Sequence, residues 1–465
     1  MAENTTKELL EGLTYKKRNV FEEASPEKIK EIYEYSKGYM NYLDNAKTER
    51  EATKTSIAIL EKNGFTEYRL GDKISVGDKR YFNQHGKALL AFKVGSEDLE
   101  KDGIRILAAH IDAPRIDLKQ VPLYEDSGMG FFKTHYYGGV KKYQWTAIPL
   151  ALHGVMIKAD GTTVDVVIGE DDTDPVFYIN DLLPHLGQKQ AQEPLGSAIS
   201  GETLNILVGG LPYADPDEKE KIKLTVLSIL NEKYGVTEED FLSAELMVVP
   251  AYKARDIGFD RALIGAYGHD DRVCAYPALT ALVDNIDTKH TVMVALADKE
   301  ETGSDGLTGM QSDYLIDVME EISKNLSKNF ARVKSVSKCL SADVTAAYDP
   351  NFKEVYEKTN SAIISCGTAI CKYTGARGKS GTSDASAELV GFFRRLFNEN
   401  GVIWQICELG KVDAGGGGTV AKYIAKHNIE TIDIGVPVIS MHAPYEVVSK
   451  ADVYSTYEAF SAFVK

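Results

Sequence analysis

The sequence predicts an α/β fold: a mixed central sheet flanked by helices, with an inserted β-rich domain. Short apolar runs alternate with helical patterns along most of the chain, which is typical of an α/β sheet. Ionisable residues directly follow several of these runs, at the position where open sheets place their ligand sites. With 465 residues, the chain is long enough for two or three domains.

Two helices are expected near the N-terminus. The first begins after Ser25, because Pro26 occupies a first-turn position that favours helix entry and apolar residues then recur at helical spacing. The second ends at Asn63 and Gly64, a pair that is typical of a helix C-terminus.

Four apolar runs are expected to form strands of the central sheet. They are ALLAFKV at 88–94, IRILAA at 104–109, HTVMVALA at 290–297 and ETIDIGVPVIS at 430–440. Each is short enough for a strand, and helical patterns separate most of them.

Between residues 120 and 250 the pattern changes to β-rich runs, such as YQWTAIPLALHGVMI and TTVDVVIG, separated by turns. The α/β pattern resumes beyond this segment. We therefore expect residues 1–119 and 251–465 to form one discontinuous domain, and residues 120–250 to form a domain inserted into it.

The composition excludes several classes of protein. A formal net charge of −16 opposes binding to nucleic acid, whose affinity depends largely on Lys and Arg. No stretch approaches the ~20 apolar residues of a membrane span, and the first residues lack the apolar core of a secretory signal. Five cysteines without a CxxC pair are typical of free thiols in a reducing compartment. We therefore expect a cytoplasmic protein that binds neither nucleic acid nor membranes.

Two of the predicted strands lead into candidate functional residues. IRILAA runs into His110 and Asp112, which would face the same side of a continued strand, so Asp112 could orient the His110 ring as a metal ligand. TVMVALA leads to the adjacent Glu300 and Glu301. One of these glutamates could bind a metal while the other accepts a proton from water.

Three further motifs complete a candidate metal site. Asp270 and Asp271 precede an apolar helical run. Asp343 follows a short apolar run, and His442 follows the last predicted strand. Two histidines with several carboxylates suit zinc, and also cobalt or manganese.

Each motif alone has an ordinary structural explanation. His110 could be a histidine with satisfied hydrogen bonds, Asp270–Asp271 a helix cap, and Glu300–Glu301 a solvated pair. Their joint occurrence at strand ends favours a metal site, because carboxylates clustered without a cation would repel one another.

A glycine run, Gly415–Gly418 followed by Thr419, lacks the GK[ST] ending of a P-loop, so nucleotide binding is not expected. Consecutive glycines could let the backbone approach a ligand closely, and Gly417 and Gly418 are candidate substrate-binding residues. The alternative is a flexible turn.

Five motifs, in order along the chain, resemble those of the aspartyl aminopeptidase family of dinuclear zinc metallopeptidases. They are HIDAPR, GHDDRVCAYPAL, DKEETGS, SADVTAAYDPNF and MHAPYE. The resemblance spans nearly the whole chain, and the β-rich insertion falls where that family carries its dimerisation domain. It implies a zinc-peptidase-like catalytic domain, two divalent metal ions per chain, peptide substrates, and a homo-oligomer in which dimers assemble into a dodecamer.

The resemblance also implies a ligand set. His110 and Asp343 would bind one metal ion, and Glu301 and His442 would bind the other. Asp270 would bridge the two ions.

Further roles follow from the same resemblance. Glu300 would be the general base, and Asp112 would orient His110. The peptide bond between Asp270 and Asp271 would be cis.

The resemblance implies two substrate-binding residues at a distance from the ligands. His185, in LLPHLGQ, would reach the active site of a neighbouring subunit, and Lys372, in ICKYTGARG, would line the pocket for the substrate side chain. The family also prefers acidic N-terminal residues. Segment 344–350 lacks the histidines that the family carries there and has Asp349 at one of their positions, which counts against this preference here.

The expected function is that of a metal-dependent aminopeptidase, which removes the N-terminal residue of a peptide by attack of a water between two metal ions. Two alternatives remain open. One is a dinuclear-metal carboxypeptidase or amide deacylase, in which a cation such as Lys372 would anchor a substrate carboxylate. The other is a catalytically silent assembly protein on the same scaffold, against which the presence of Glu300 and a full ligand set argues.

Overall fold

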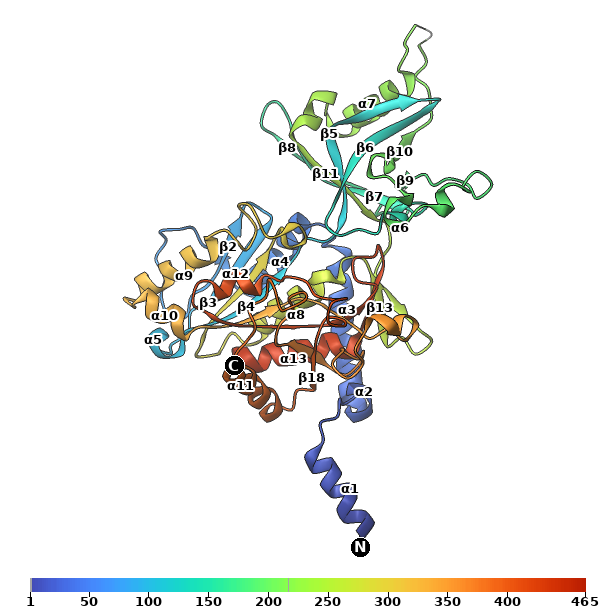
Figure 1. Ribbon diagram of the computed structural model, residues 1–465. Coiled ribbons are helices and arrows are strands. Elements are labelled where there is room, and N and C mark those ends of the chain that lie inside the picture. The colour runs from blue at the N-terminus through green and yellow to red at the C-terminus, as the bar shows by residue number, and fades with distance from the viewer. Residues whose placement is uncertain (1, 216) are drawn as a thin grey trace.

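The computed structural model describes residues 2–215 and 217–465. The chain folds into a large α/β body and a smaller β-rich part that projects from it (Figure 1). In the described residues, the strands form three sheets of nine, seven and five strands. The predicted α/β class is therefore confirmed.

Four helices open the chain. They are α1 (Ala2–Leu13), α2 (Val20–Glu23), α3 (Pro26–Asp44) and α4 (Glu49–Lys62). The Ser25 side chain caps α3 by accepting a hydrogen bond from the Lys28 N–H, and Thr48 and Glu51 form a capping box at α4. Both predicted N-terminal helices are confirmed, and α1 and α2 precede them.

The nine-stranded sheet forms the centre of the body, in the order β1-β2-β3-β14-β4-β15-β19-β17-β18. Its strands are β1 (Thr66–Glu67), β2 (Lys79–Gln84), β3 (Ala88–Lys93), β4 (Ile104–His110), β14 (Thr291–Ala297), β15 (Lys338–Ala342), β17 (Thr368–Cys371), β18 (Trp404–Cys407) and β19 (Glu430–Gly435). The four inner strands β14, β4, β15 and β19 are parallel. Because β3 is antiparallel to β14, and β17 to β19, the sheet is mixed, as predicted.

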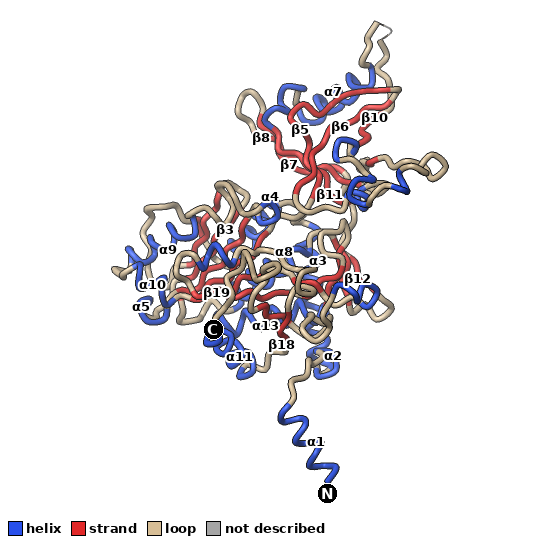
Figure 2. Tube along the Cα trace, viewed as in Figure 1, coloured by secondary structure: helices blue, strands red, loops and turns tan. Residues whose placement is uncertain are grey.

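Helices lie on both sides of this sheet (Figure 2). Beyond α4, the helices of the body are α5 (Leu99–Asp102), α8 (His269–Asp284), α9 (Tyr314–Asn325), α10 (Phe330–Val336), α11 (Ala387–Glu399), α12 (Ala421–Ala425) and α13 (Lys450–Val464). Leu107 of β4 shares one apolar core with Leu279 of α8, whereas its neighbour Ile106 shares another with Val318 of α9. Both faces of β4 are buried, which explains its continuous apolar sequence. No helix among the described residues is long and apolar enough to cross a membrane.

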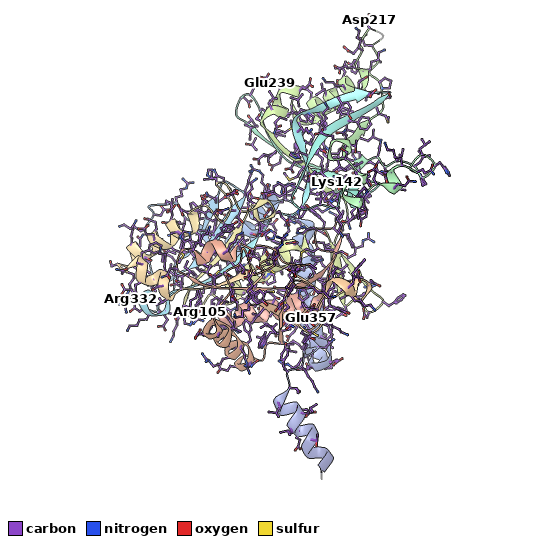
Figure 3. All side chains as sticks on the ribbon, in the orientation of Figure 1. Arg105, Lys142, Asp217, Glu239, Arg332 and Glu357 are labelled. Atoms are coloured by element: carbon purple, nitrogen blue, oxygen red, sulfur yellow. The ribbon has the colours of Figure 1, made fainter. Side chains whose placement is uncertain are left out.

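The projecting part is built on the seven-stranded sheet, in the order β8-β7-β11-β5-β6-β10-β9. Its strands are β5 (Arg115–Asp126), β6 (Met129–Tyr137), β7 (Leu150–Ile157), β8 (Thr163–Ile168), β9 (Tyr178–Ile179), β10 (Ile206–Gly209) and β11 (Ala244–Pro250), and its helices are α6 (Leu195–Ala198) and α7 (Lys221–Tyr234). Figure 3 places Asp217 and Glu239 far from the body and Lys142 near it. The sheet begins at Arg115, earlier than residue 120, because β5 pairs with β11 through residues of mixed polarity that carry no clear strand pattern.

The five-stranded sheet completes the body, in the order β12-β13-β21-β20-β16. Its strands are β12 (Arg255–Ile257), β13 (Leu263–Ala266), β16 (Thr345–Ala346), β20 (Pro437–Ile439) and β21 (Glu446–Ser449). The predicted single strand at 430–440 is wrong, because β19 and β20 belong to different sheets. Gly435 lies at the division, where a Cβ would be 1.6 Å from the backbone oxygen of Asp343, so the close approach requires glycine. The sequence predicts that His442 follows the last strand of the chain. Instead it lies between β20 and β21.

Charged residues at the start of α4 connect the body to the projecting sheet. His153 of β7 lies between two carboxylates, with Nδ1 2.7 Å from Glu51 and Nε2 3.1 Å from Glu170. Lys47 also contacts Glu170, at 2.5 Å. Further ion pairs across the same junction join Glu49 with Arg115, Arg50 with Glu245, and Lys54 with Asp165.

Candidate metal centre and active site

Three neighbouring strands of the nine-stranded sheet bring ionisable side chains to one edge. β4 ends at His110 and lies between β14 and β15. β14 leads to Glu300 and Glu301, and β15 leads to Asp343. Because the three strands are parallel, their carboxyl ends meet at the same edge, as the sequence predicts.

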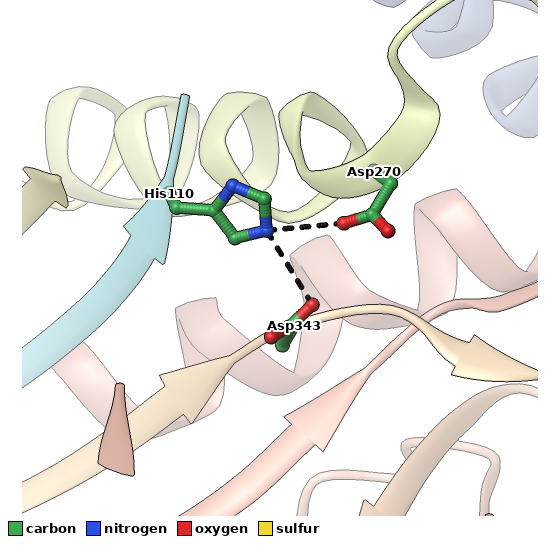
Figure 4. A group of neighbouring side chains, drawn as sticks. All are labelled: His110, Asp270 and Asp343. Atoms are coloured by element: carbon green, nitrogen blue, oxygen red, sulfur yellow. Dashed lines mark hydrogen bonds and ion pairs between the residues drawn. The ribbon is translucent and has the colours of Figure 1, made fainter. Parts of the chain in front are cut away.

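His110 is buried and faces two carboxylates (Figure 4). Its Nε2 atom lies 3.0 Å from Oδ1 of Asp270 and 3.7 Å from Oδ1 of Asp343. Its Nδ1 atom lies 3.1 Å from the backbone oxygen of Asp112 and 3.2 Å from Oδ1 of the same residue. A proton on Nδ1 satisfies these oxygens and leaves the Nε2 lone pair free to bind a metal between the carboxylates.

His442 is arranged in the same way on the other side of Asp270. Its Nε2 atom lies 3.1 Å from Oδ2 of Asp270 and 3.5 Å from Oε2 of Glu301. Its Nδ1 atom lies 3.1 Å from the backbone oxygen of Gly139. Nε2 of this ring is therefore also free to bind a metal.

The five predicted metal ligands lie in two overlapping groups, in each of which one atom per residue lies within 4.8 Å of the others. The groups are His110, Asp270 and Asp343, and Asp270, Glu301 and His442. Asp270 belongs to both. Its peptide bond to Asp271, at the entrance of α8, is cis, as the resemblance implied.

Asp112 connects the His110 strand to the glutamate loop. Its Oδ1 and Oδ2 atoms accept the backbone N–H groups of Glu300 and Glu301, both at 3.2 Å. Oδ2 also accepts the Tyr137 hydroxyl at 2.7 Å. Asp112 thus contacts His110 and also fixes the backbone from which both glutamates extend. The spacing of the motifs does not indicate this contact with the glutamates.

Glu446 of β21 is a positioning residue that the sequence reasoning missed. It is buried, and its Oε1 atom accepts the backbone N–H of His442 at 2.7 Å. Its Oε2 atom accepts the backbone N–H of Asp270 at 3.1 Å. One carboxylate thus fixes the backbone of two predicted ligands. The signal for it in the sequence is its place at the end of the MHAPYE motif.

The cluster buries several carboxylates close together. Burial raises the pKa of Glu300 to about 8, and the carboxylates of Asp343 and Asp270 contribute in the same direction. Burial also raises the pKa of Glu301 and of Asp343. Oε1 of Glu301 is one of the described buried side-chain atoms that have no hydrogen-bond partner. Divalent cations would supply that partner and offset the repulsion, and imidazoles combined with carboxylates are donors that zinc binds.

A cavity of about 260 Å³ lies beside the cluster, and Gly417 and Gly418 line it. Four residues of the cluster also line it: Asp270, Glu300, Asp343 and His442. No atom lies within 4 Å of the position that a Cβ on Gly417 would take, so this glycine faces open space. Gly416, by contrast, is crowded: its φ is +118°, and a Cβ there would lie 2.5 Å from Cα of Ala376.

Two candidate substrate-binding residues lie elsewhere. Lys372 follows β17, and its ammonium lies 3.1 Å from Oδ1 of Asp384. His185 is exposed in the loop after β9 of the projecting part. Within the described part of the chain, no hydrogen bond or ion pair joins either residue to the cluster. Their proposed roles therefore rest on the sequence motifs.

Comparison with known proteins identifies the family. A profile of the aminopeptidase I zinc metalloprotease family (M18) matches residues 42–464. The chain belongs to the M18 family. As an M18 aminopeptidase it is a zinc-dependent hydrolase that removes N-terminal residues, so the predicted class and activity are confirmed.

Curated relatives of this M18 aminopeptidase cover nearly its whole length. The probable M18 family aminopeptidase 1 of Clostridium acetobutylicum is 46% identical over 456 residues, which are 96% of this chain and 98% of that protein. The protein of the same name from Thermotoga maritima is 45% identical over 445 residues, which are 94% and 97% of the two chains.

Solved structures share the fold. The M18 aminopeptidase of T. maritima superposes with a TM-score of 0.93 at 44% identity, covering 97% of this chain and all of that one. Aminopeptidase I of C. acetobutylicum gives 0.91 at 43% identity with the same coverage. The mApe1 dodecamer of S. cerevisiae gives 0.76 at 22% identity over 92% and 96% of the chains, a likeness that concerns the fold alone.

Proposed function

We propose that this M18 aminopeptidase binds two zinc ions per chain, with Asp270 as the ligand they share. His110 and Asp343 would complete one site, and Glu301 and His442 the other. The observation that carries this assignment is that the two oxygens of Asp270 face Nε2 atoms of different histidines. Cobalt or manganese would suit the same donors.

Glu300 is the proposed general base. Its backbone is fixed by Asp112, it lines the cavity, and the ligand assignment leaves its side chain free. Glu300 would take a proton from the attacking water and deliver it to the leaving amine. Bound zinc would polarise the scissile carbonyl and stabilise the negative charge that develops on its oxygen.

The cavity supports a preference for uncharged N-terminal side chains. Apolar residues form part of its wall, namely Val344, Leu409, Ile434 and Met441. The described lining contains no lysine or arginine, and Lys372 is paired with Asp384. An acidic substrate side chain would face the carboxyl groups of Asp433 and Glu300 and would find no cationic side chain in this lining to pair with.

The same lining argues against a carboxypeptidase, because a substrate carboxylate would need a cationic side chain as its anchor. A free α-amino group would instead be attracted by the carboxylates of Asp270 and Glu300, and this attraction would confine cleavage to the N-terminus.

The test compares free and N-acetylated peptides, using zinc-loaded enzyme and N-terminal Leu, Met, Ala, Lys, Asp and Glu. We expect cleavage of free peptides only, with higher kcat/KM for Leu, Met and Ala than for Asp and Glu. Cleavage of acetylated peptides at similar rates would contradict the proposal that the carboxylates of the cavity anchor the free α-amino group. A higher kcat/KM for Asp or Glu would contradict the preference for uncharged side chains.

The projecting part is the proposed interface of a homo-oligomer, in which dimers assemble into a dodecamer and His185 reaches a neighbouring active site. Three leucines around His185 are 46%, 49% and 69% exposed, which suits a surface that another subunit covers. They are Leu182, Leu183 and Leu186. The yeast mApe1 assembly, which is a dodecamer with the same fold, supports this proposal. A closed symmetric oligomer would complete every site through one type of interface.

A cytoplasmic location is proposed on the chemistry of the cysteines. All five are free thiols and all are buried. Free thiols without a disulfide framework are typical of reducing compartments, where peptides from protein turnover would be the substrates.

A further inference from the structure

Two buried thiols lie together beside the substrate cavity, and one of them, Cys371, lines it. Sγ of Cys371 lies 3.0 Å from Sγ of Cys407. The two residues are paired in register at the ends of the adjacent parallel strands β17 and β18. Cys371 is 6% exposed and Cys407 3% exposed, and Cys371 lines the cavity that also contains Glu300. In the described residues, no other cysteine forms a hydrogen bond with a second sulfur.

We propose that Cys371 and Cys407 form a reversible disulfide when a hydroperoxide enters the substrate cavity, and that this bond lowers aminopeptidase activity. A disulfide joins its sulfurs at about 2.05 Å, so the two atoms need to approach by only about 1 Å. Neighbouring strands lie about 4.8 Å apart, which is within the Cα separations of about 4.4–6.8 Å that disulfides span. The sheet therefore already presents the two residues at a suitable separation.

The environment of the sulfurs suits this reaction. The hydrogen bond with Cys371 lowers the pKa of the Cys407 thiol although burial opposes it, and the Lys17 ammonium acts in the same direction as that bond. The Cys407 thiolate would attack one oxygen of hydrogen peroxide, break the O–O bond and form a sulfenic acid, while the hydroxide released becomes water on taking a proton. Cys371 would then lose its proton and attack the sulfenic sulfur, which releases a second water. Two thiols and one hydrogen peroxide thus give one disulfide and two waters.

The bond would act on activity through the cavity wall. Oγ1 of Thr345 lies 3.6 Å from Sγ of Cys407 and 3.7 Å from Sγ of Cys371, and Thr345 lines the cavity. The segments that continue β17 and β18 contribute Thr374 and Leu409 to the same lining. Oxidation would draw the two sulfurs together and alter their contacts with Thr345. We expect KM to rise more than kcat falls, because no metal ligand takes part in the bond.

The experiment treats zinc-loaded enzyme with graded amounts of hydrogen peroxide, removes the excess with catalase, alkylates free thiols and maps peptides under non-reducing conditions. The expected result is a linked Cys371–Cys407 peptide, with a loss of kcat/KM that a phosphine reductant reverses. Peptide mapping needs no activity, so it tests the bond even if the proposed roles of the metal ligands fail.

Matched variants separate this pair from general oxidation. Cys366 is 6% exposed, like Cys371, and Cys366→Ser should form the linked peptide and lose activity as the wild type does. Cys407→Ser should form no linked peptide and should keep its activity after peroxide treatment. If circular dichroism shows that Cys407→Ser does not fold, Cys371→Ser is used in its place. The proposal is overturned if both thiols of the wild type remain alkylatable at every peroxide concentration that leaves the fold intact. It is equally overturned if the linked peptide forms without a change in kcat/KM, or if Cys407→Ser loses activity to the same extent.

Discussion

Oδ2 of Asp270 lies 3.1 Å from Nε2 of His442, while Oδ1 of the same carboxylate lies 3.0 Å from Nε2 of His110. The two histidines are positioned by different sheets. His110 ends β4 of the nine-stranded sheet, and His442 lies in the loop between β20 and β21 of the five-stranded sheet. The entrance of α8 therefore places one carboxylate between two imidazoles. This position makes Asp270 the residue on which both proposed zinc sites depend.

Replacing Asp270 should therefore empty both sites. We expect Asp270→Ala to retain almost no zinc after dialysis, whereas Asp343→Ala retains about one ion per chain, because Asp343 belongs to one group only. Elemental analysis by mass spectrometry gives the zinc content, and circular dichroism checks that both variants fold. Equal zinc contents in the two variants would show that Asp270 is not shared.

His153 predicts a pH dependence of stability. Burial disfavours its charged form, but hydrogen bonds with Glu170 and Glu51 outweigh burial and raise the pKa of His153 above its usual value. Lys47 and Lys253 also face Glu170, at 2.5 and 2.6 Å. Because the folded pKa exceeds the unfolded value of about 6.5, the stabilisation is fully present below pH ~6.5 and is lost as pH rises through the folded pKa.

The measurement compares melting temperatures of the wild type and His153→Gln at pH 6 and pH 9. Glutamine keeps hydrogen-bonding capacity but lacks the charge, so we expect the wild type to exceed the variant by more at pH 6 than at pH 9. His135→Gln is the control, since His135 is an exposed histidine of the same sheet. A difference in melting temperature that is the same at both pH values, or larger at pH 9, would refute the stabilising contacts of charged His153 with Glu51 and Glu170.

The trans role of His185 predicts complementation between inactive chains. Glu300→Gln and His185→Ala chains should each be inactive as homo-oligomers, and mixing them under subunit exchange should restore activity. Some sites would then combine an intact Glu300 with an intact His185 of a neighbour. His135→Ala, an exposed histidine of the same projecting sheet, should be active by itself. Mixed oligomers seen by native mass spectrometry that stay inactive would exclude His185 from the neighbouring site.

Much of the site could be predicted because its residues follow apolar runs directly in sequence. His110 ends β4, Glu300 and Glu301 follow β14, and Asp343 follows β15, so each motif lies at the carboxyl end of one of three neighbouring parallel strands. The fold class follows from the same runs. For a sheet buried on both faces, continuous apolar strands are a strong sequence signal.

The remainder could not be predicted because it depends on contacts between distant segments. Glu446 accepts the backbone N–H of Asp270, which is 176 residues away in the sequence, besides that of the nearby His442. Tyr137 reaches Asp112 from the projecting sheet. The run at 430–440 divides between two sheets at Gly435, where the backbone passes close to Asp343 of a distant segment. The ion pair between Lys372 and Asp384 is likewise visible only in three dimensions. It gives the lysine a partner other than a substrate side chain.

The proton-transfer role of Glu300 is the central claim of the account, and turnover of Glu300→Gln tests it most directly. The variant keeps the backbone N–H that Asp112 accepts and all five proposed ligands, so it should retain its zinc and its melting temperature. We expect kcat on a free N-terminal leucine peptide to fall at least about 100-fold, the usual scale for loss of a general base. A kcat close to that of the wild type, at equal zinc content, would contradict the account.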